Sequence, residues 1–174
     1  MAASPDPAAP AAAQKPSRID LVNAWFKAHL DSEAGVACVT EDMVFNMPPS
    51  CGRALTMGLP WAGRDSLRRL GILDRALYET YGQASTMNLH FTIEEGDYVM
   101  MQFDSRFGAW NGRQYHNYYV MTIRFEGDEI AEVWDVTDTA YLEETILDTP
   151  ESRAGYDERV ARMRAEMKAP SDVW

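Results

Sequence analysis

The sequence has little of what metal, redox and disulfide proteins need. Its 174 residues include only two cysteines and three histidines, which are Cys38, Cys51, His29, His90 and His116. Two cysteines are too few for a disulfide framework, and no Cys-x-x-Cys pair is present for metal or redox chemistry. Gly-rich nucleotide loops, a Gly-x-Ser-x-Gly elbow and a His-Glu-x-x-His motif are also missing. We therefore expect no metal site and no bound cofactor.

Basic residues are scarce as well. The chain has 16 Lys and Arg against 27 Asp and Glu, which gives a net charge of -11. Nucleic acids and anionic membranes attract clustered Lys and Arg, so neither is an expected partner. The charge is uneven, because residues 1–125 carry a net -2 and residues 126–174 a net -9. We interpret the acidic part as a solvated face, with repulsion of anionic ligands as the alternative.

Long hydrophobic runs are missing too. No segment approaches the roughly 18 consecutive apolar residues that a membrane span needs. The first residues are rich in Ala and Pro and do not resemble a secretory signal. We expect a disordered tail over residues 1–16, one domain over 17–149 and a helical extension over 150–174. The protein is predicted to be soluble and cytoplasmic.

The first half of the domain has mostly helical periodicity. Apolar residues at helical spacing predict helices over residues 18–30 and 32–39, followed by a short strand over 43–46. Residues 47–63 contain three prolines and three glycines and are expected to be irregular. A long helix capped by Asp65 follows, and its apolar stripe continues to Tyr81.

The second half changes to a period of two. Strands are predicted over residues 86–94, 98–110, 114–125 and 129–138, separated by Gly-Asp and Asn-Gly turns. Such turns are typical of hairpins, so we expect an antiparallel meander. Helices over 139–147 and 152–168 complete an α+β fold. A strongly bent sheet wrapped around the long helix would enclose a cone-shaped cavity.

Asp135 is the principal candidate for chemistry. On the strand 129–138 it shares a face with Ala131 and Val133, which are small apolar residues expected to point inward. Burial raises the pKa of a carboxyl group, which makes Asp135 a candidate general base or acid. The alternative is a helix cap, a role for which Asp138 is better placed.

A second polar group lies on the strand 98–110. Gln102, Asp104 and Arg106 share one face, which is either a pocket wall or an exposed face with an ion pair. His90 on the preceding strand faces either the solvent or the site.

The strand 114–125 offers surface for a ligand. Its inward positions alternate aromatic, amide and thioether side chains, namely Tyr115, Asn117, Tyr119 and Met121. This pattern suits a flat and mostly apolar molecule, with core packing as the alternative. Trp61 in the irregular segment is a candidate for the mouth of the pocket or an anchor for its loop.

The other face of the same strands is also apolar. It carries Tyr118, Val120, Thr122 and Trp134. A sheet face of this kind is unfavourable in water, so we predict a homodimer through it.

Residues 112–146, GRQYHNYYVMTIRFEGDEIAEVWDVTDTAYLEETI, resemble the C-terminal half of SnoaL-like, ketosteroid-isomerase-related proteins of the nuclear-transport-factor-2-like superfamily. The matching positions are Tyr115, Asn117, Tyr119, Phe125, residues 127–130, Asp135 and Asp138. The order of elements matches over residues 17–147. The resemblance implies the cone-shaped fold and proton transfer on a neutral hydrophobic molecule, although this fold supports many activities.

Residues 41–49, EDMVFNMPP, partly resemble limonene-epoxide-hydrolase-like enzymes. Asn46 matches the asparagine that holds water in that family, and Asp104 and Asp135 match its two aspartates. Val44 replaces the expected tyrosine and Gln102 the expected arginine, for which Arg106 could substitute. Epoxide hydrolysis is therefore kept as the alternative activity.

The leading hypothesis is a cofactor-free lyase or isomerase. The superfamily resemblance implies a polyketide-like or aromatic substrate, such as a lignin-derived aromatic dimer. Asp135 would move a proton, Asp104 and Arg106 would act on a departing hydroxyl or oxyanion, and Asn46 and His90 would orient it. A non-catalytic binding or dimerisation module is the third possibility.

Overall fold

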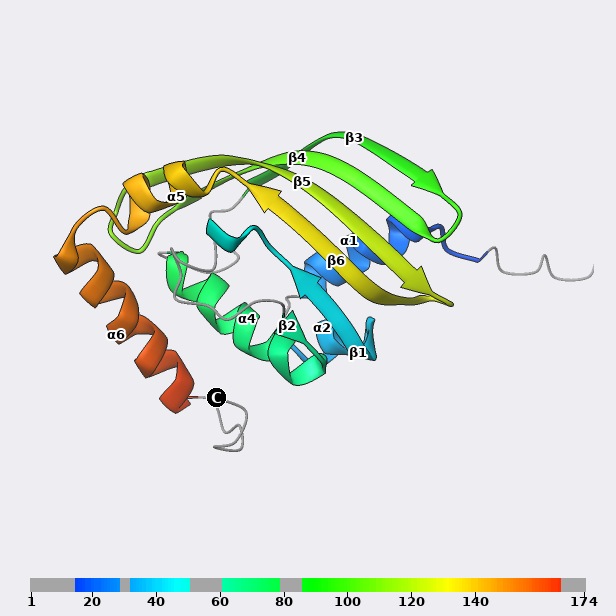
Figure 1. Ribbon diagram of the computed structural model, residues 1–174, viewed down its shortest axis with the longest axis horizontal. Coiled ribbons are helices and arrows are strands. Elements are labelled where there is room, and N and C mark those ends of the chain that lie inside the picture. Colours follow the sequence, from blue (N-terminus) through cyan, green and yellow to red (C-terminus); the bar gives the residue numbers. More distant parts are fainter. Residues whose placement is uncertain (1–14, 29–31, 51–60, 79–85, 167–174) are drawn as a thin grey trace, which may run out of the picture.

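A curved sheet folds over three helices (Figure 1). The computed structural model describes residues 15–28, 32–50, 61–78 and 86–166. The helices on the concave side of the sheet are α1 (Arg18–Ala28), α2 (Glu33–Val36) and α4 (Arg64–Leu77). Two further helices follow the last strand, α5 (Thr139–Ile146) and α6 (Pro150–Glu166). The predicted α+β architecture, with a bent sheet wrapped around a long helix, is confirmed.

The sheet has six strands in the order β2-β1-β6-β5-β4-β3. They are β1 (Val39–Asn46), β2 (Trp61–Ala62), β3 (Thr86–Glu95), β4 (Tyr98–Gly108), β5 (Gln114–Glu126) and β6 (Glu129–Thr137). β3 to β6 pair as the predicted antiparallel meander. Two of its turns use Gly96 (φ 57°) and Gly127 (φ 62°), in a backbone region that glycine adopts without strain. β1 runs parallel to β6 and extends the sheet.

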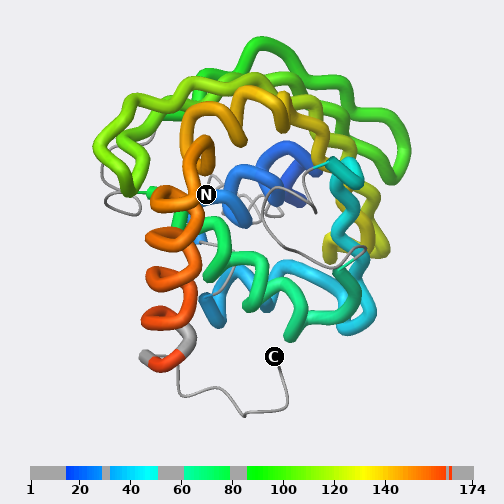
Figure 2. The backbone as a smooth tube through the Cα atoms, turned by 60° about the vertical axis from the view of Figure 1, so that its left-hand side comes forward, coloured from blue at the N-terminus to red at the C-terminus, as the bar shows by residue number. Residues whose placement is uncertain are grey.

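The core lies between the concave face of the sheet and the helices. Most odd-numbered residues of β4 and β5 are buried there, because side chains alternate faces along a strand. They pack with Trp25 on α1 and with Leu67, Leu70 and Leu73 on α4. Figure 2 shows α4, in green, beneath the sheet. The concave face is therefore the one on which an enclosed site can form.

Several predicted boundaries differ from the structure. The N-cap of α4 is Gly63, whose φ of 81° suits glycine, and Asp65 lies in the first turn and pairs with Arg68 at 2.9 Å. Hydrogen bonding to β6 starts β1 at Val39, well before the predicted strand. The predicted helix 32–39 is accordingly reduced to the single turn of α2. Asp138 is the N-cap of α5, as expected, and accepts from the Tyr141 N–H.

Some predictions lie outside the described residues, namely residues 1–14 of the tail, His29, Cys51, most of the irregular segment and the stripe end at Tyr81. Among the helices that are described, none is long and apolar enough to cross a membrane.

Candidate functional site

The concave face brings together Asp135 and four of the predicted ligand-binding residues. Asp135 on β6 is paired with Met121 on β5, and Tyr119 is paired with Thr137. Tyr115 and Asn117 point to the same side, because they are four and two residues before Tyr119 on β5. The predicted wall of Tyr115, Asn117, Tyr119 and Met121 therefore lies on the face that carries Asp135.

Asp135 is a buried carboxyl group. The residue is 7% exposed, and its Oδ1 has no hydrogen-bond partner within the described part of the chain. Burial, with a smaller contribution from the negative charge of Asp74, raises the pKa of Asp135 to about 7. A carboxyl group with this pKa can both accept and donate a proton near neutral pH.

Tyr119, which lies near Asp135, is a neutral hydroxyl group. Burial raises the pKa of Tyr119 well above its usual range, and Tyr115, Tyr78 and Asp135 raise it further. The Tyr119 ring stacks on Phe103 with centroids 4.9 Å apart. Tyr119 therefore keeps its proton and can donate a hydrogen bond.

Asn117 fixes this wall to the end of the sheet. Its Nδ2 donates to the Tyr115 hydroxyl and, at 2.8 Å, to the Asp138 carbonyl. Its Oδ1 accepts from the Tyr118 N–H at 2.8 Å. Both ends of this amide are thus used by the protein, so Asn117 orients Tyr115.

Sequence reasoning missed two residues of this interior, Asp74 in the last turn of α4 and Tyr78 at its C-cap. The Tyr78 hydroxyl donates to Asp74 Oδ1 at 3.2 Å. The Tyr78 ring lies against Phe107 with centroids 4.0 Å apart. A signal was available, because Asp74 follows Leu70 by four residues and so places a carboxylate beside the apolar stripe of α4.

Asp104 lies on the opposite, convex face of the sheet. It is paired with Tyr118 on β5 and Asn88 on β3, whereas Asp135 is paired with Met121. Asp104 is only 3% exposed, because its hydrogen-bonding neighbours cover it. They are Asn88 at 3.1 Å, His90 at 2.9 Å and His116 at 3.0 Å, with Arg106 at 3.5 Å.

The electrostatics of Asp104 are opposite to those of Asp135. Desolvation acts to raise the pKa of Asp104, but hydrogen bonds from Asn88, His116 and His90 outweigh it, and the pKa lies below its ordinary value. Such a carboxylate remains ionised and paired at neutral pH. We interpret this group of residues as a structural network.

The expectation that Asp104, Arg106, His90 and Asn46 share one cavity with Asp135 does not hold. Gln102 and Arg106 lie on the convex face with Asp104, because all three are even-numbered residues of β4. Asn46 is paired with Trp134 and donates to Glu132 Oε1 and the Val133 carbonyl, both at 3.3 Å. Alternation along each strand was predicted correctly, but only the register between strands shows which faces coincide.

Trp61 is buried in the core. It lies on β2 opposite Phe45, is 7% exposed, and its ring lies 5.0 Å from the guanidinium carbon of Arg69. This placement fits the anchoring role better than a position at the mouth of a pocket.

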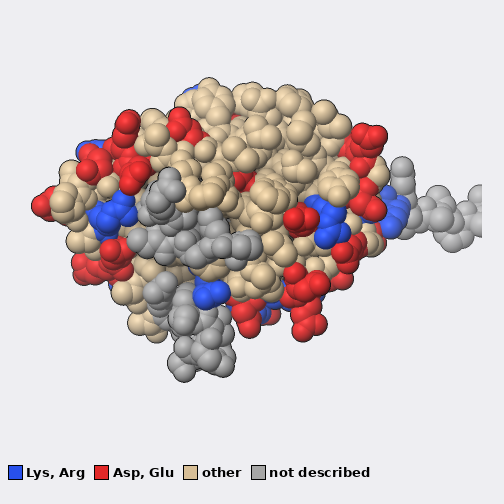
Figure 3. All heavy atoms as spheres, in the orientation of Figure 1, with Lys and Arg blue, Asp and Glu red and all other residues tan. Residues whose placement is uncertain are grey.

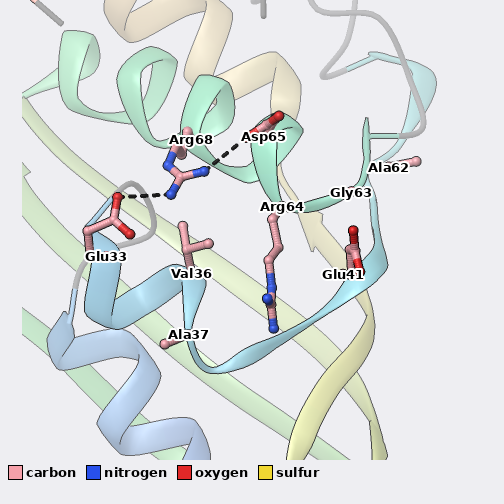
Figure 4. A pocket seen from close by; sticks show the side chains of 9 residues that line it. All are labelled: Glu33, Val36, Ala37, Glu41, Ala62, Gly63, Arg64, Asp65 and Arg68. Atoms are coloured by element: carbon pink, nitrogen blue, oxygen red, sulfur yellow. Dashed lines mark hydrogen bonds and ion pairs between the residues drawn. The ribbon is translucent and has the colours of Figure 1, made fainter. Parts of the chain in front are cut away.

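A separate hollow of about 630 Å³ lies at the start of α4 (Figure 4). Its two arginines are already engaged. Arg68 bonds Glu33 and Asp65, each at 2.9 Å, and Arg64 donates to the Val39 carbonyl and to Glu129. We assign no chemistry to this hollow. Within the described residues, no group of three or more His, Cys, Asp or Glu side chains is arranged to hold a metal ion.

The sequence profile of the SnoaL-like domain matches residues 20–133. No curated protein sequence matches the chain. Among solved structures, the chain is similar to an NTF2-like protein of unknown function from Burkholderia pseudomallei. That similarity has a TM-score of 0.64 and 20% identity, and it covers 74% of this chain and 96% of the other.

Two further structures carry provisional assignments as polyketide cyclases. IdmH from Streptomyces antibioticus has a TM-score of 0.61 and 18% identity, covering 74% of this chain and 97% of its own. A SnoaL-like protein from Jannaschia sp. CCS1 has a TM-score of 0.59 and 13% identity, covering 79% and 99%. At such identities the similarity shows a common fold and leaves the activity open.

Proposed function

Because this chain belongs to the SnoaL-like domain family, we propose that it is a cofactor-independent acid–base enzyme that isomerises or cyclises a neutral hydrophobic molecule. One observation carries this proposal. Asp135 is buried, its Oδ1 is unpartnered among the described residues, and its pKa is raised to about 7. A side chain of this kind is costly for folding and useful for proton transfer, so its presence favours a catalytic role.

In the proposed reaction Asp135 removes a proton from a carbon next to a carbonyl group. The C–H electron pair forms the new double bond, and the carbonyl electrons move to oxygen. Tyr119, which keeps its proton, stabilises that oxygen by hydrogen bonding. The protonated Asp135 then returns the proton at another carbon, so no cofactor is consumed.

The substrate is expected to be neutral and largely apolar. Asp135 and Asp74 already place two carboxyl groups in the interior, so an anionic substrate would be repelled. The aromatic side chains of Tyr119, Phe103 and Phe107 offer a flat apolar surface. A polyketide-like compound has both properties, and the two similar proteins assigned as polyketide cyclases favour it. A lignin-derived aromatic dimer, cleaved by a lyase reaction, is the other class.

Epoxide hydrolysis loses its support. It requires Asn46, Asp104 and Arg106 to act with Asp135, and these three residues lie on the other face of the sheet. The alternative that remains is a binding module without turnover.

Proton exchange into a panel of neutral ketones tests the proposal. The purified protein would be incubated in D₂O with aromatic 1,3-diketones and cyclic β,γ-unsaturated ketones, and NMR would follow deuterium entering the carbon next to the carbonyl. We expect Asp135→Asn to slow exchange roughly a thousandfold. Asp104→Asn is the matched control and should retain most of the activity. Full exchange by Asp135→Asn would refute the catalytic assignment, and saturable binding without exchange would identify a binding module.

We also propose that the convex face forms a homodimer. Tyr118 and Trp134 are 55% and 53% exposed, and Val120 and Val136 next to them are also exposed. Figure 3 shows the top of the molecule, above the sheet, largely free of charged side chains. On a chain with a net charge of -11, such a face is where a second copy meets the least repulsion. The occupant we propose is therefore another copy of this chain.

A further inference from the structure

The C-terminal helix α6 lies outside the SnoaL-like match and has no role in the function proposed above. It packs beside α4, as the orange-red and green helices of Figure 2 show. Tyr156 and Val160 are its buried apolar residues. Hydrogen bonds fix the position of α6 along α4, because the polar groups of α6 bond to the C-terminal part of α4.

Three hydrogen bonds join α6 to carbonyl groups at this end of α4. The Tyr156 hydroxyl donates to the Leu73 carbonyl at 3.2 Å. Arg159 donates from Nε to the Ala76 carbonyl at 3.0 Å and from Nη2 to the Tyr78 carbonyl at 2.7 Å. The last carbonyls of a helix lack partners within the helix, and a cation there also complements the helix dipole. Arg159 therefore caps α4 from a distance of 81 or more residues in sequence.

The same turn is held from the sheet side. The Trp110 N–H donates to the Leu77 carbonyl at 3.0 Å, and Tyr78 forms an isolated bridge with Ala109. α6 also packs tightly here, because a Cβ at Gly155 would overlap the Trp110 ring. The end of α4 is thus fixed between the sheet and α6.

This turn carries Asp74 and Tyr78, the two residues that face the interior with Asp135. Tyr78 donates to Asp74, and its ring lies against Phe107. The charge of Asp74 contributes to the raised pKa of Asp135, and Tyr78 contributes to that of Tyr119. A displacement of the turn would therefore change the environment of the base.

We propose that α6 contributes to the site by positioning the end of α4 through Arg159 and Tyr156. The end of α4 in turn holds Asp74 and Tyr78 against the interior that contains Asp135. The inference rests on the proposed function only where turnover is concerned. The coupling between α6 and the pKa of Asp135 can be measured without a substrate. Arg159 and Asp74 are accordingly positioning residues.

The test is Arg159→Met, compared with Arg153→Met. Both substitutions remove an arginine from α6, but the Arg153 guanidinium pairs with Glu143 and makes none of the three bonds to α4. Carbon-detected NMR titration of the Asp135 carboxyl group in the ligand-free protein is the first readout. We expect Arg159→Met to lower the pKa of Asp135 toward its ordinary value and Arg153→Met to leave it unchanged. Asp74→Asn should lower it as well, and Arg159→Met should add less in that background.

Turnover is the second readout. Arg159→Met should lower kcat about tenfold on the best ketone of the panel with little change in KM, because it disturbs positioning rather than binding. If Arg159→Met does not fold, Tyr156→Phe removes one of the bonds and keeps the ring. An unchanged Asp135 pKa in a folded but less stable variant would overturn the proposal and leave α6 a structural element. Since the titration needs no substrate, failure of the proposed activity and failure of this coupling are separable.

Discussion

Asp104 on β4 and Asp135 on β6 lie on strands of one sheet that are separated by β5, and both have small exposed fractions, yet their pKa values move in opposite directions. Asp104 on the convex face accepts hydrogen bonds from Asn88, His90 and His116. Asp135 on the concave face has an oxygen with no partner among the described residues. A small exposed fraction therefore does not by itself decide the protonation state of a carboxyl group, because its depth in the protein and the hydrogen bonds from its neighbours both act on its pKa.

The comparison also separates structure from function. A paired carboxylate stabilises the fold and is poorly available to a substrate, because its lone pairs are already used. An unpaired one destabilises the ionised form of the protein and stays available for proton transfer. The four predictions below test this contrast, from the largest expected effect to the smallest.

The pH dependence of turnover gives the largest effect. The base must be ionised, so kcat/KM should fall about tenfold for each pH unit below the pKa of Asp135, which is about 7. Steady-state kinetics between pH 5 and 9, on the best ketone of the exchange panel, measure this limb. Asp104→Asn should show the same fall of kcat/KM at low pH. A shift of the apparent pKa in that variant would contradict the assignment of the proton transfer to Asp135.

The contribution of Asp135 to the free energy of unfolding should fall as the pH rises, which is the opposite of the contribution of a carboxylate in an ordinary ion pair. The folded-state pKa of about 7 lies above the ordinary value of 3.8, so the stabilising contribution is complete below about pH 4 and is lost as the pH rises to about 7. We expect Asp135→Asn to raise the free energy of unfolding at pH 8 by up to roughly 4 kcal/mol and to change it little at pH 4. Urea denaturation at the two pH values measures the difference, and equal effects at both would contradict it.

The dimer prediction concerns the convex face as a whole. Val136→Lys places a charge at an exposed apolar position of this face and should weaken association by about 2 kcal/mol or more. Leu89→Lys is the matched control, since Leu89 is similarly exposed but is paired with Phe103, whose side chain points to the concave side. Sedimentation velocity over a dilution series reports the result. A monomeric parent protein, or equal effects of both variants, would count against the proposed interface.

Asp104→Asn is expected to give the smallest effect, and it should destabilise the protein at neutral pH. The folded-state pKa of Asp104 is lowered, so its contribution is present above the unfolded-state pKa and is lost as the pH falls through the folded-state value. Thermal unfolding should therefore show a lower midpoint for the variant at pH 7 and a smaller difference at pH 3. If the variant were more stable than the parent protein at pH 7, the hydrogen bonds to Asp104 would not offset the cost of burying its charge.

Much of the fold was predictable because it depends on local patterns. Gly-Asp and Asn-Gly turns between stretches of period two gave the meander, and helical spacing gave α1 and α4. Asp138 was correctly predicted as a helix cap, since the hydrogen bond of a cap spans only three residues. The resemblance to SnoaL-like proteins is confirmed by the family match and by the similar structures.

The grouping of side chains around the site was less predictable. The inward position of Asp135 followed from two apolar neighbours on its own strand. The position of Asp104 depended on the register of β4 against β5, and the bulge between Leu89 and Phe91 determines how His90 reaches it. Asp74 and Tyr78 belong to another segment altogether, and Arg159 reaches their turn from the far end of the chain.

The sequence by itself thus determined the elements, their order, and which residues of one strand share a face, because these follow from interactions between near neighbours. The tertiary structure alone decided which faces meet, which of two aspartates has an oxygen without a partner among the described residues, and which helix end lies against the site. Those outcomes depend on strand register and helix packing, which bring together residues that are distant in sequence.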